Sequence, residues 1–70
     1  MEKVKEFLEN QLKYSEAIIN GDENSAEIYA AKNRGVFENF TKTDWEELIS
    51  QSHGRAKYEY TRMMKERFPD

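Results

Sequence analysis

The chain has 70 residues, a formal net charge of −3, one histidine and no cysteine. A chain of this length forms one domain at most and buries only about 60% of the surface that its unfolded form exposes. We therefore expect a single helical domain over residues 1–70 with a thin core. The lack of cysteine excludes disulfides and thiolate metal sites. The negative charge makes nucleic acid the less favoured partner, because phosphate contacts dominate that affinity.

Charged residues make up 36% of the chain and hydrophobic residues 37%, a balance typical of a folded protein. No apolar run approaches the roughly 20 residues that span a bilayer. Residues 1–6 lack the basic start and apolar run of a signal peptide. We expect a cytoplasmic protein that does not enter the membrane. No motif identifies a family, although small acidic helical proteins are common among bacterial and phage accessory proteins.

The first predicted helix covers residues 2–19, where apolar residues recur at three- and four-residue steps. Asn20-Gly21 supplies the expected helix stop. The apolar stripe consists of Val4, Phe7, Leu8, Leu12, Ile18 and Ile19.

The second predicted helix covers residues 23–40. Asp22 or Asn24 can cap it, and Asn24 would place Glu27 at the capping-box position. Gly35 lies inside the helical pattern and costs roughly 1 kcal/mol relative to alanine. The main stripe consists of Ala26, Tyr29, Ala30, Asn33, Val36, Phe37 and Phe40.

The third predicted helix begins at the capping box Thr43-Asp44-Trp45-Glu46. At Ser52-His53-Gly54 it either breaks or continues. Apolar residues keep one helical phase from Trp45 to Met64, whereas a break would normally reset that phase. We therefore predict one long helix over residues 44–67.

Three amphipathic helices joined by short loops predict an all-α, antiparallel three-helix bundle. The third helix would be roughly 36 Å long against about 27 Å for the others. Its C-terminal end would then overhang the bundle. The overhang would carry Tyr58, Tyr60, Met63, Met64 and Phe68.

Few features of the sequence indicate catalysis or metal binding. His53 has no cysteine to activate, and Ser50 and Ser52 lie at unhelpful offsets on the same predicted helix. We expect His53 to be a helix residue at the edge of the core. Metal ligation by His53 and Glu46 would need a second histidine, which the chain lacks. We expect no enzyme activity, no metal and no cofactor.

Some apolar residues lie on the outer faces of the predicted helices. Ile28, Ala31 and Gly35 fall together, opposite the main stripe of the second helix. Tyr58 lies near Arg62, and these residue types are enriched at binding hot spots. The predicted partner-binding residues are Ile28, Ala31, Gly35, Tyr58, Arg62, Met64 and Phe68.

We therefore expect a non-enzymatic interaction or regulatory module that binds a protein partner and forms a homodimer. The alternative is a DNA-binding regulator. Residues 55–67 are rich in lysine and arginine and contain two tyrosines. If the third helix breaks near Gly54, residues 46–67 would form a helix-turn-helix.

Overall fold

The structure, a computed structural model, describes residues 2–69, which contain four helices and no strand. The helices are α1 (Glu2–Ile19), α2 (Glu23–Glu38), α3 (Lys42–Ser50) and α4 (Gly54–Arg67). The all-α prediction is confirmed, but the number of helices is four and not three. None of the helices in the described part of the chain is long and apolar enough to cross a membrane.

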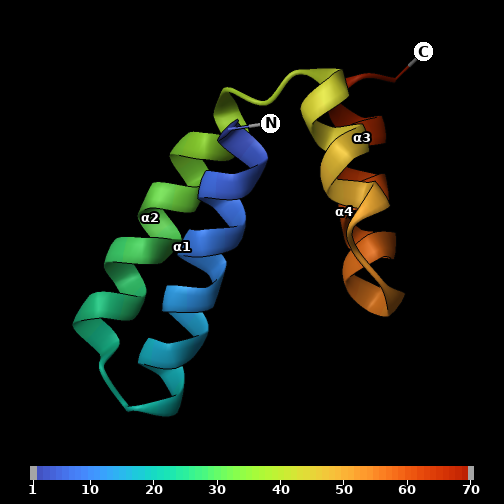
Figure 1. The fold of residues 1–70 in the computed structure, drawn as a ribbon. Helices are drawn as coiled ribbons and strands as arrows, with labels where there is room; N and C mark the ends of the chain where they lie inside the picture. The colour runs from blue at the N-terminus through green and yellow to red at the C-terminus, as the bar shows by residue number, and fades with distance from the viewer. Residues whose placement is uncertain (1, 70) are drawn as a thin grey trace.

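α1 and α2 form a long antiparallel hairpin, and their packing matches the sequence prediction (Figure 1). α1 ends at the predicted stop, where Gly21 takes a positive φ of 71° and Asp22 donates its amide to the Ala17 carbonyl. Of the two candidate caps for α2, Asp22 is the one used. Its carboxylate accepts from the amide and the hydroxyl of Ser25.

The prediction of one helix over residues 44–67 was wrong. α3 ends at Ser50, the Ser52 hydroxyl donates to the Leu48 carbonyl, and His53 is extended. Gly54 then adopts a φ of 60°, a left-handed conformation that glycine reaches without strain. The chain reverses there, so that α4 runs back alongside α3 as a second, shorter hairpin (Figure 1).

The start of α3 also differs from the prediction. Its capping box is Thr41-Lys42-Thr43-Asp44, two residues earlier than the predicted one. Asp44 donates its amide to the Thr41 hydroxyl, and its carboxylate accepts from the Thr41 amide. Asp44 is therefore the acidic residue of the capping box. Trp45, the next residue, lies in the core and is fully buried.

The core lies where the two hairpins meet. Its buried cluster consists of Val4, Phe7, Val36, Phe40, Trp45 and Leu48. From α4 and its C-terminal cap, Tyr60, Met63, Met64 and Phe68 pack against this cluster as half-buried side chains. The predicted overhang of these residues was therefore wrong, because the reversal at Gly54 folds α4 back over the core.

The C-terminal end of α2 has no basic residue in its own last turn. Cationic side chains from α1 and α4 donate hydrogen bonds to carbonyl groups there. The Arg67 guanidinium donates to the Phe37 carbonyl (3.2 Å), and the Lys3 ammonium donates to the Asn39 carbonyl (2.8 Å). The Phe37 carbonyl also accepts from the Phe40 amide (3.2 Å), so the two cations add to the hydrogen bonding at this helix end, where the dipole favours positive charge. They also hold α1 and α4 at the same end of α2.

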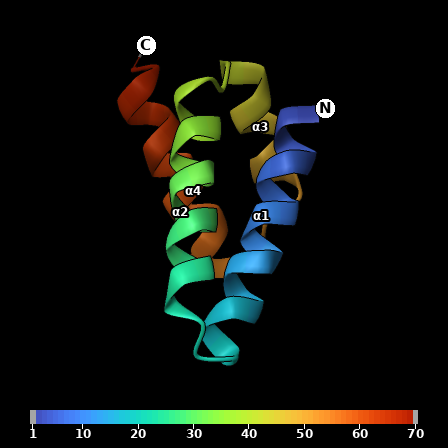
Figure 2. The ribbon, with the colours of Figure 1, turned by 90° about the vertical axis from the view of Figure 1, so that its left-hand side faces the viewer.

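The hairpins differ in length, and this difference shapes the molecule. α1 and α2 extend well past the turn between α3 and α4, as both ribbon views show (Figures 1 and 2). The longest principal extent is 40 Å, against 24 and 20 Å for the other two. The overhanging part is therefore the turn end of the α1–α2 hairpin, residues 12–30, which we call the tip.

Candidate functional site

The tip has almost no core of its own. Within residues 8–32, all of which the structure describes, the buried side chains are Ala17 and Ala26. The base of the same hairpin is covered by α3 and α4, but nothing among residues 2–69 covers the tip. A two-helix hairpin without a third layer buries too little apolar surface to be stable alone.

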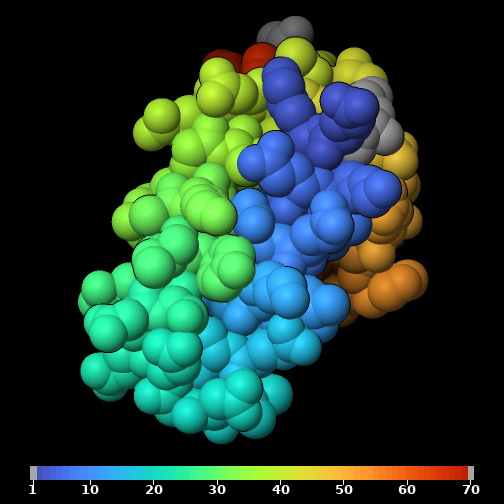
Figure 3. All heavy atoms as spheres, turned by 60° about the vertical axis from the view of Figure 1, so that its left-hand side comes forward, coloured from blue at the N-terminus to red at the C-terminus, as the bar shows by residue number. Residues whose placement is uncertain are grey.

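Four large apolar side chains of α1 are exposed beside or on the tip, and we call them the tip face. They are Leu8, Leu12, Ile18 and Ile19, with exposed fractions of 37%, 62%, 55% and 83%. Leu8 and Leu12 line a groove of about 360 Å³ that is bounded by Gln51 at the end of α3. Figure 3 shows the atoms of the tip extending beyond those of the α3–α4 turn.

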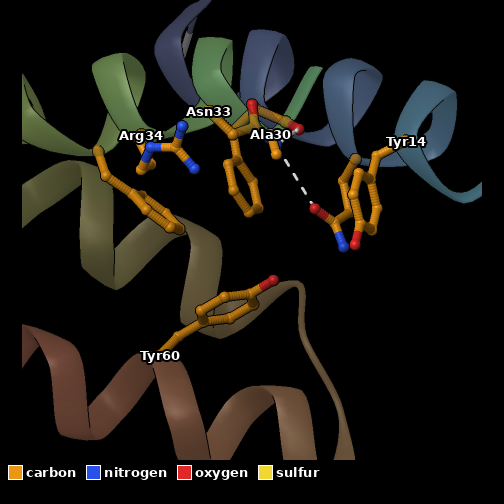
Figure 4. A pocket seen from close by; sticks show the side chains of 8 residues that line it. Tyr14, Ala30, Asn33, Arg34 and Tyr60 are labelled. Carbon is orange, nitrogen blue, oxygen red and sulfur yellow. Dashed lines mark hydrogen bonds between the residues drawn. The ribbon is translucent and has the colours of Figure 1, made fainter. Parts of the chain in front are cut away.

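A second, more apolar groove lies on the other side of the α3–α4 turn, between the long hairpin and α4. Its volume is about 310 Å³, and we call it the aromatic groove (Figure 4). Phe7 and Phe37 stack in its wall with ring centroids 4.6 Å apart. Tyr60 reaches from α4 and meets Phe7 edge to face at 5.7 Å. Burial raises the pKa of the Tyr60 hydroxyl above its ordinary value.

The aromatic groove contains a polar bridge between α1 and α2. Asn33 donates its side-chain amide to the Phe7 carbonyl (3.3 Å) and to Gln11 Oε1 (3.4 Å). Asn33 is 6% exposed, and its Oδ1 has no hydrogen-bond partner among the described residues. A buried acceptor without a partner is costly, and this oxygen has almost no accessible surface through which a bound group could reach it.

The aromatic groove continues onto the tip. Tyr14 and Ala30 line both this groove and a neighbouring hollow of about 420 Å³ that reaches Ile18 and Ala26. Tyr14 and Tyr60 lie on opposite sides of the aromatic groove in Figure 4. One continuous, mostly apolar track therefore leads from α4 to the end of the long hairpin.

The structure does not bring the predicted partner-binding residues together. Ile28 (54% exposed), Ala31 and Gly35 lie on the other side of α2 from the aromatic groove, next to a polar hollow that Gly35 lines. Tyr58 is 66% exposed on the outer face of α4. Of the other three, Met64 and Phe68 pack on the core, while Arg62 pairs with Glu59 at 3.2 Å on the exposed surface.

Sequence reasoning placed the tip-face residues in the core and so missed this surface. They share an apolar stripe with Val4 and Phe7, which are buried, and periodicity cannot separate the two groups. Gly54 is the sequence feature that could have predicted the exposure of the tip-face residues. A break there leaves helices of 9 and 14 residues to cover helices of 18 and 16 residues.

His53 lies in the exposed turn before α4 and not, as predicted, in a helix at the edge of the core. Within residues 2–69 no group of three or more histidine, aspartate or glutamate side chains could hold a metal ion. A scan against protein-family models and searches of curated proteins and of solved structures find no match to this chain.

Proposed function

We propose that this protein is a small non-enzymatic interaction module that binds a helical protein segment through the tip face and the adjoining aromatic groove. The observation that carries the proposal is the exposure of Leu12, Ile18 and Ile19 on a hairpin end whose own buried residues are two alanines. Apolar side chains scattered singly on a surface are ordinary, but several on one short hairpin end with no core beneath them indicate an interaction site.

A helix is the partner shape that suits this surface. The track between α1 and α2 runs along the hairpin, and an amphipathic helix recognises such a groove with apolar anchors at i, i+3, i+4 and i+7. Each leucine or isoleucine that goes from exposed to fully buried contributes about 1.5–3 kcal/mol. Of the tip face, Ile18 lines this track and supplies part of the binding free energy, whereas Leu8 and Leu12 line the separate groove beside Gln51.

Specificity would come from the polar groups of the aromatic groove. Asn33 Oδ1 accepts no hydrogen bond, and Gln11 and Arg34 line the same groove. A partner side chain with an aromatic body and an N–H or O–H donor, such as tryptophan or tyrosine, would match both the aromatic wall and the exposed Gln11 side chain, whose Oε1 can accept a further hydrogen bond.

Site-specific photo-cross-linking tests the proposal. A photoreactive amino acid replaces Leu12 in one variant and Ile28 in a second, and each purified protein is irradiated alone and in an extract of its source organism. The two positions have similar exposure, 62% and 54%, but lie on different faces. We expect discrete adducts from position 12 and none from position 28. Equal labelling at both positions, or none at position 12, would contradict the proposal.

The break before α4 favours a second candidate, the binding of nucleic acid by the outer face of this helix. α4 contains five basic residues and two acidic ones, a net charge of +3 within a chain of −3. However, Arg67 is engaged with α2 and Arg62 with Glu59. The remaining basic side chains of α4, Arg55, Lys57 and Lys65, are exposed.

Salt dependence tests this second candidate. Binding to a DNA or RNA oligonucleotide should weaken linearly on a log–log plot of affinity against salt concentration. Arg55→Gln and Lys65→Gln should each reduce the slope by about 1. Binding without a salt slope, or no binding at low salt, would remove this candidate.

A further inference from the structure

We propose that the helical partner that covers the tip face is the tip of a second copy of the chain, so that the α1 helices of the two tips pack against each other in antiparallel orientation. This inference rests on the proposed function of the tip face and names its partner.

The monomer exposes more surface than a compact protein of its mass. Its accessible surface is 5150 Å², about 500 Å² above the roughly 4,600 Å² expected for 8.4 kDa. A standard protein interface buries about 800 Å² on each partner. The size of this excess is of the order that a small dimer interface would remove from each chain.

The order of side chains on α1 is self-complementary. Leu12, Ser15 and Ile19 are separated by three and four residues and therefore share one face of the helix. Ser15 is small, exposed and almost midway between the two large side chains. A two-fold axis at Ser15 brings Leu12 of one copy against Ile19 of the other, twice, while the small serines allow the helices to approach closely. Interfaces of this isologous kind are the commonest among homo-oligomers.

The charges near Leu12 and Ile19 on α1 also allow a second copy to pack there. Ser15 is uncharged, and Glu16, which by the same spacing also lies between Leu12 and Ile19, pairs with Lys13 of its own helix at 4.0 Å. The Lys13 ammonium compensates the Glu16 carboxylate within each copy, so each copy brings a neutral pair to the contact and not an isolated negative charge.

Sedimentation velocity over a concentration series, with cross-linking as a second readout, tests the inference. We expect the purified chain to form a species of twice 8.4 kDa. Leu12→Glu should raise the dimer dissociation constant by about 100-fold, as for a central interface residue. Ile28→Glu and Tyr58→Glu change similarly exposed apolar residues elsewhere and should leave the dimer intact.

A cysteine variant covers the case in which Leu12→Glu fails to fold. Because the chain has no cysteine, Ser15→Cys introduces a single thiol on the proposed axis, and Ser50→Cys introduces one on α3. A short bismaleimide should join two copies of the first variant and not of the second. Equal cross-linking of both variants would overturn the inference, as would a dimer lost in Ile28→Glu but retained in Leu12→Glu.

The photo-cross-linking experiment separates this inference from the proposed function. An adduct of twice the chain mass from position 12 of the purified protein supports both. A strictly monomeric chain whose position 12 labels a different protein overturns the second copy and leaves the interaction module standing. A monomer with no adduct at position 12 overturns both.

Discussion

Phe37 of α2 stacks on Trp45 of α3, with ring centroids 4.9 Å apart and planes 20° apart. Phe37 also stacks on Phe7 of α1, and Tyr60 of α4 lies 6.3 Å from it. This one side chain therefore contacts rings from all three other helices. The two hairpins are joined through it, and it forms part of the wall of the aromatic groove at the same time.

Phe37→Ala should destabilise the protein by about 3–5 kcal/mol, because it removes a core ring and leaves a cavity between the hairpins. Small domains have only about 5–15 kcal/mol of stability in total, so partial unfolding is expected. Urea denaturation followed by Trp45 fluorescence measures the loss. Tyr58→Ala, which removes an exposed ring, should change stability by less than about 0.5 kcal/mol. Similar losses in the two variants would show that the stack does not join the hairpins.

Two glycine substitutions should have opposite effects. Gly54→Ala forces a Cβ into a left-handed backbone conformation and should cost about 1–2 kcal/mol. Gly35→Ala lies inside α2, where an added Cβ meets nothing within 4 Å, and should stabilise by about 1 kcal/mol. Chemical denaturation of both variants measures the difference. Stabilisation by Gly54→Ala would indicate that α3 and α4 form one continuous helix.

Arg67→Met should lower the free energy of unfolding by about 0.3–1 kcal/mol, because the Phe37 carbonyl at the end of α2 loses a cationic partner. Methionine keeps the length and the apolar stem of the side chain. Lys65→Met is the matched control, since Lys65 is an exposed cation in the last turn of α4. Thermal unfolding at low and at high salt should show a loss that shrinks with salt in the first variant only. Equal losses would assign the effect to the dipole of α4 itself.

Stability should fall at alkaline pH because of Tyr60. Burial raises the pKa of this phenol, so above about pH 10 the unfolded chain releases the proton while the folded chain retains it. The unfolded state then binds fewer protons, and the free energy of unfolding decreases as pH rises. Urea unfolding between pH 8 and 11 should show a smaller decrease for Tyr60→Phe than for the unaltered chain. Tyr58→Phe, on the exposed face of α4, should behave like the unaltered chain; if it reduces the decrease as much, burial of Tyr60 is not the cause.

The sequence by itself determined the helical class, both boundaries of α1 and the start of α2. These features depend on interactions within a few residues: the apolar stripe, the stop at Gly21 and the cap at Asp22. The sequence also identified Trp45, Leu48 and Phe40 as apolar positions, and the structure buries all three.

The course of the last third of the chain, and the choice of which apolar residues stay exposed, depend on how the helices pack together. α3 and α4 both face the same core, so a reversal at Gly54 keeps the apolar phase that a continuous helix would have. Periodicity reports which side of a helix is apolar, but not how far along its length another helix covers it. The shorter α3–α4 hairpin covers Val4 and Phe7 and leaves Leu12, Ile18 and Ile19 exposed, although all five belong to one stripe.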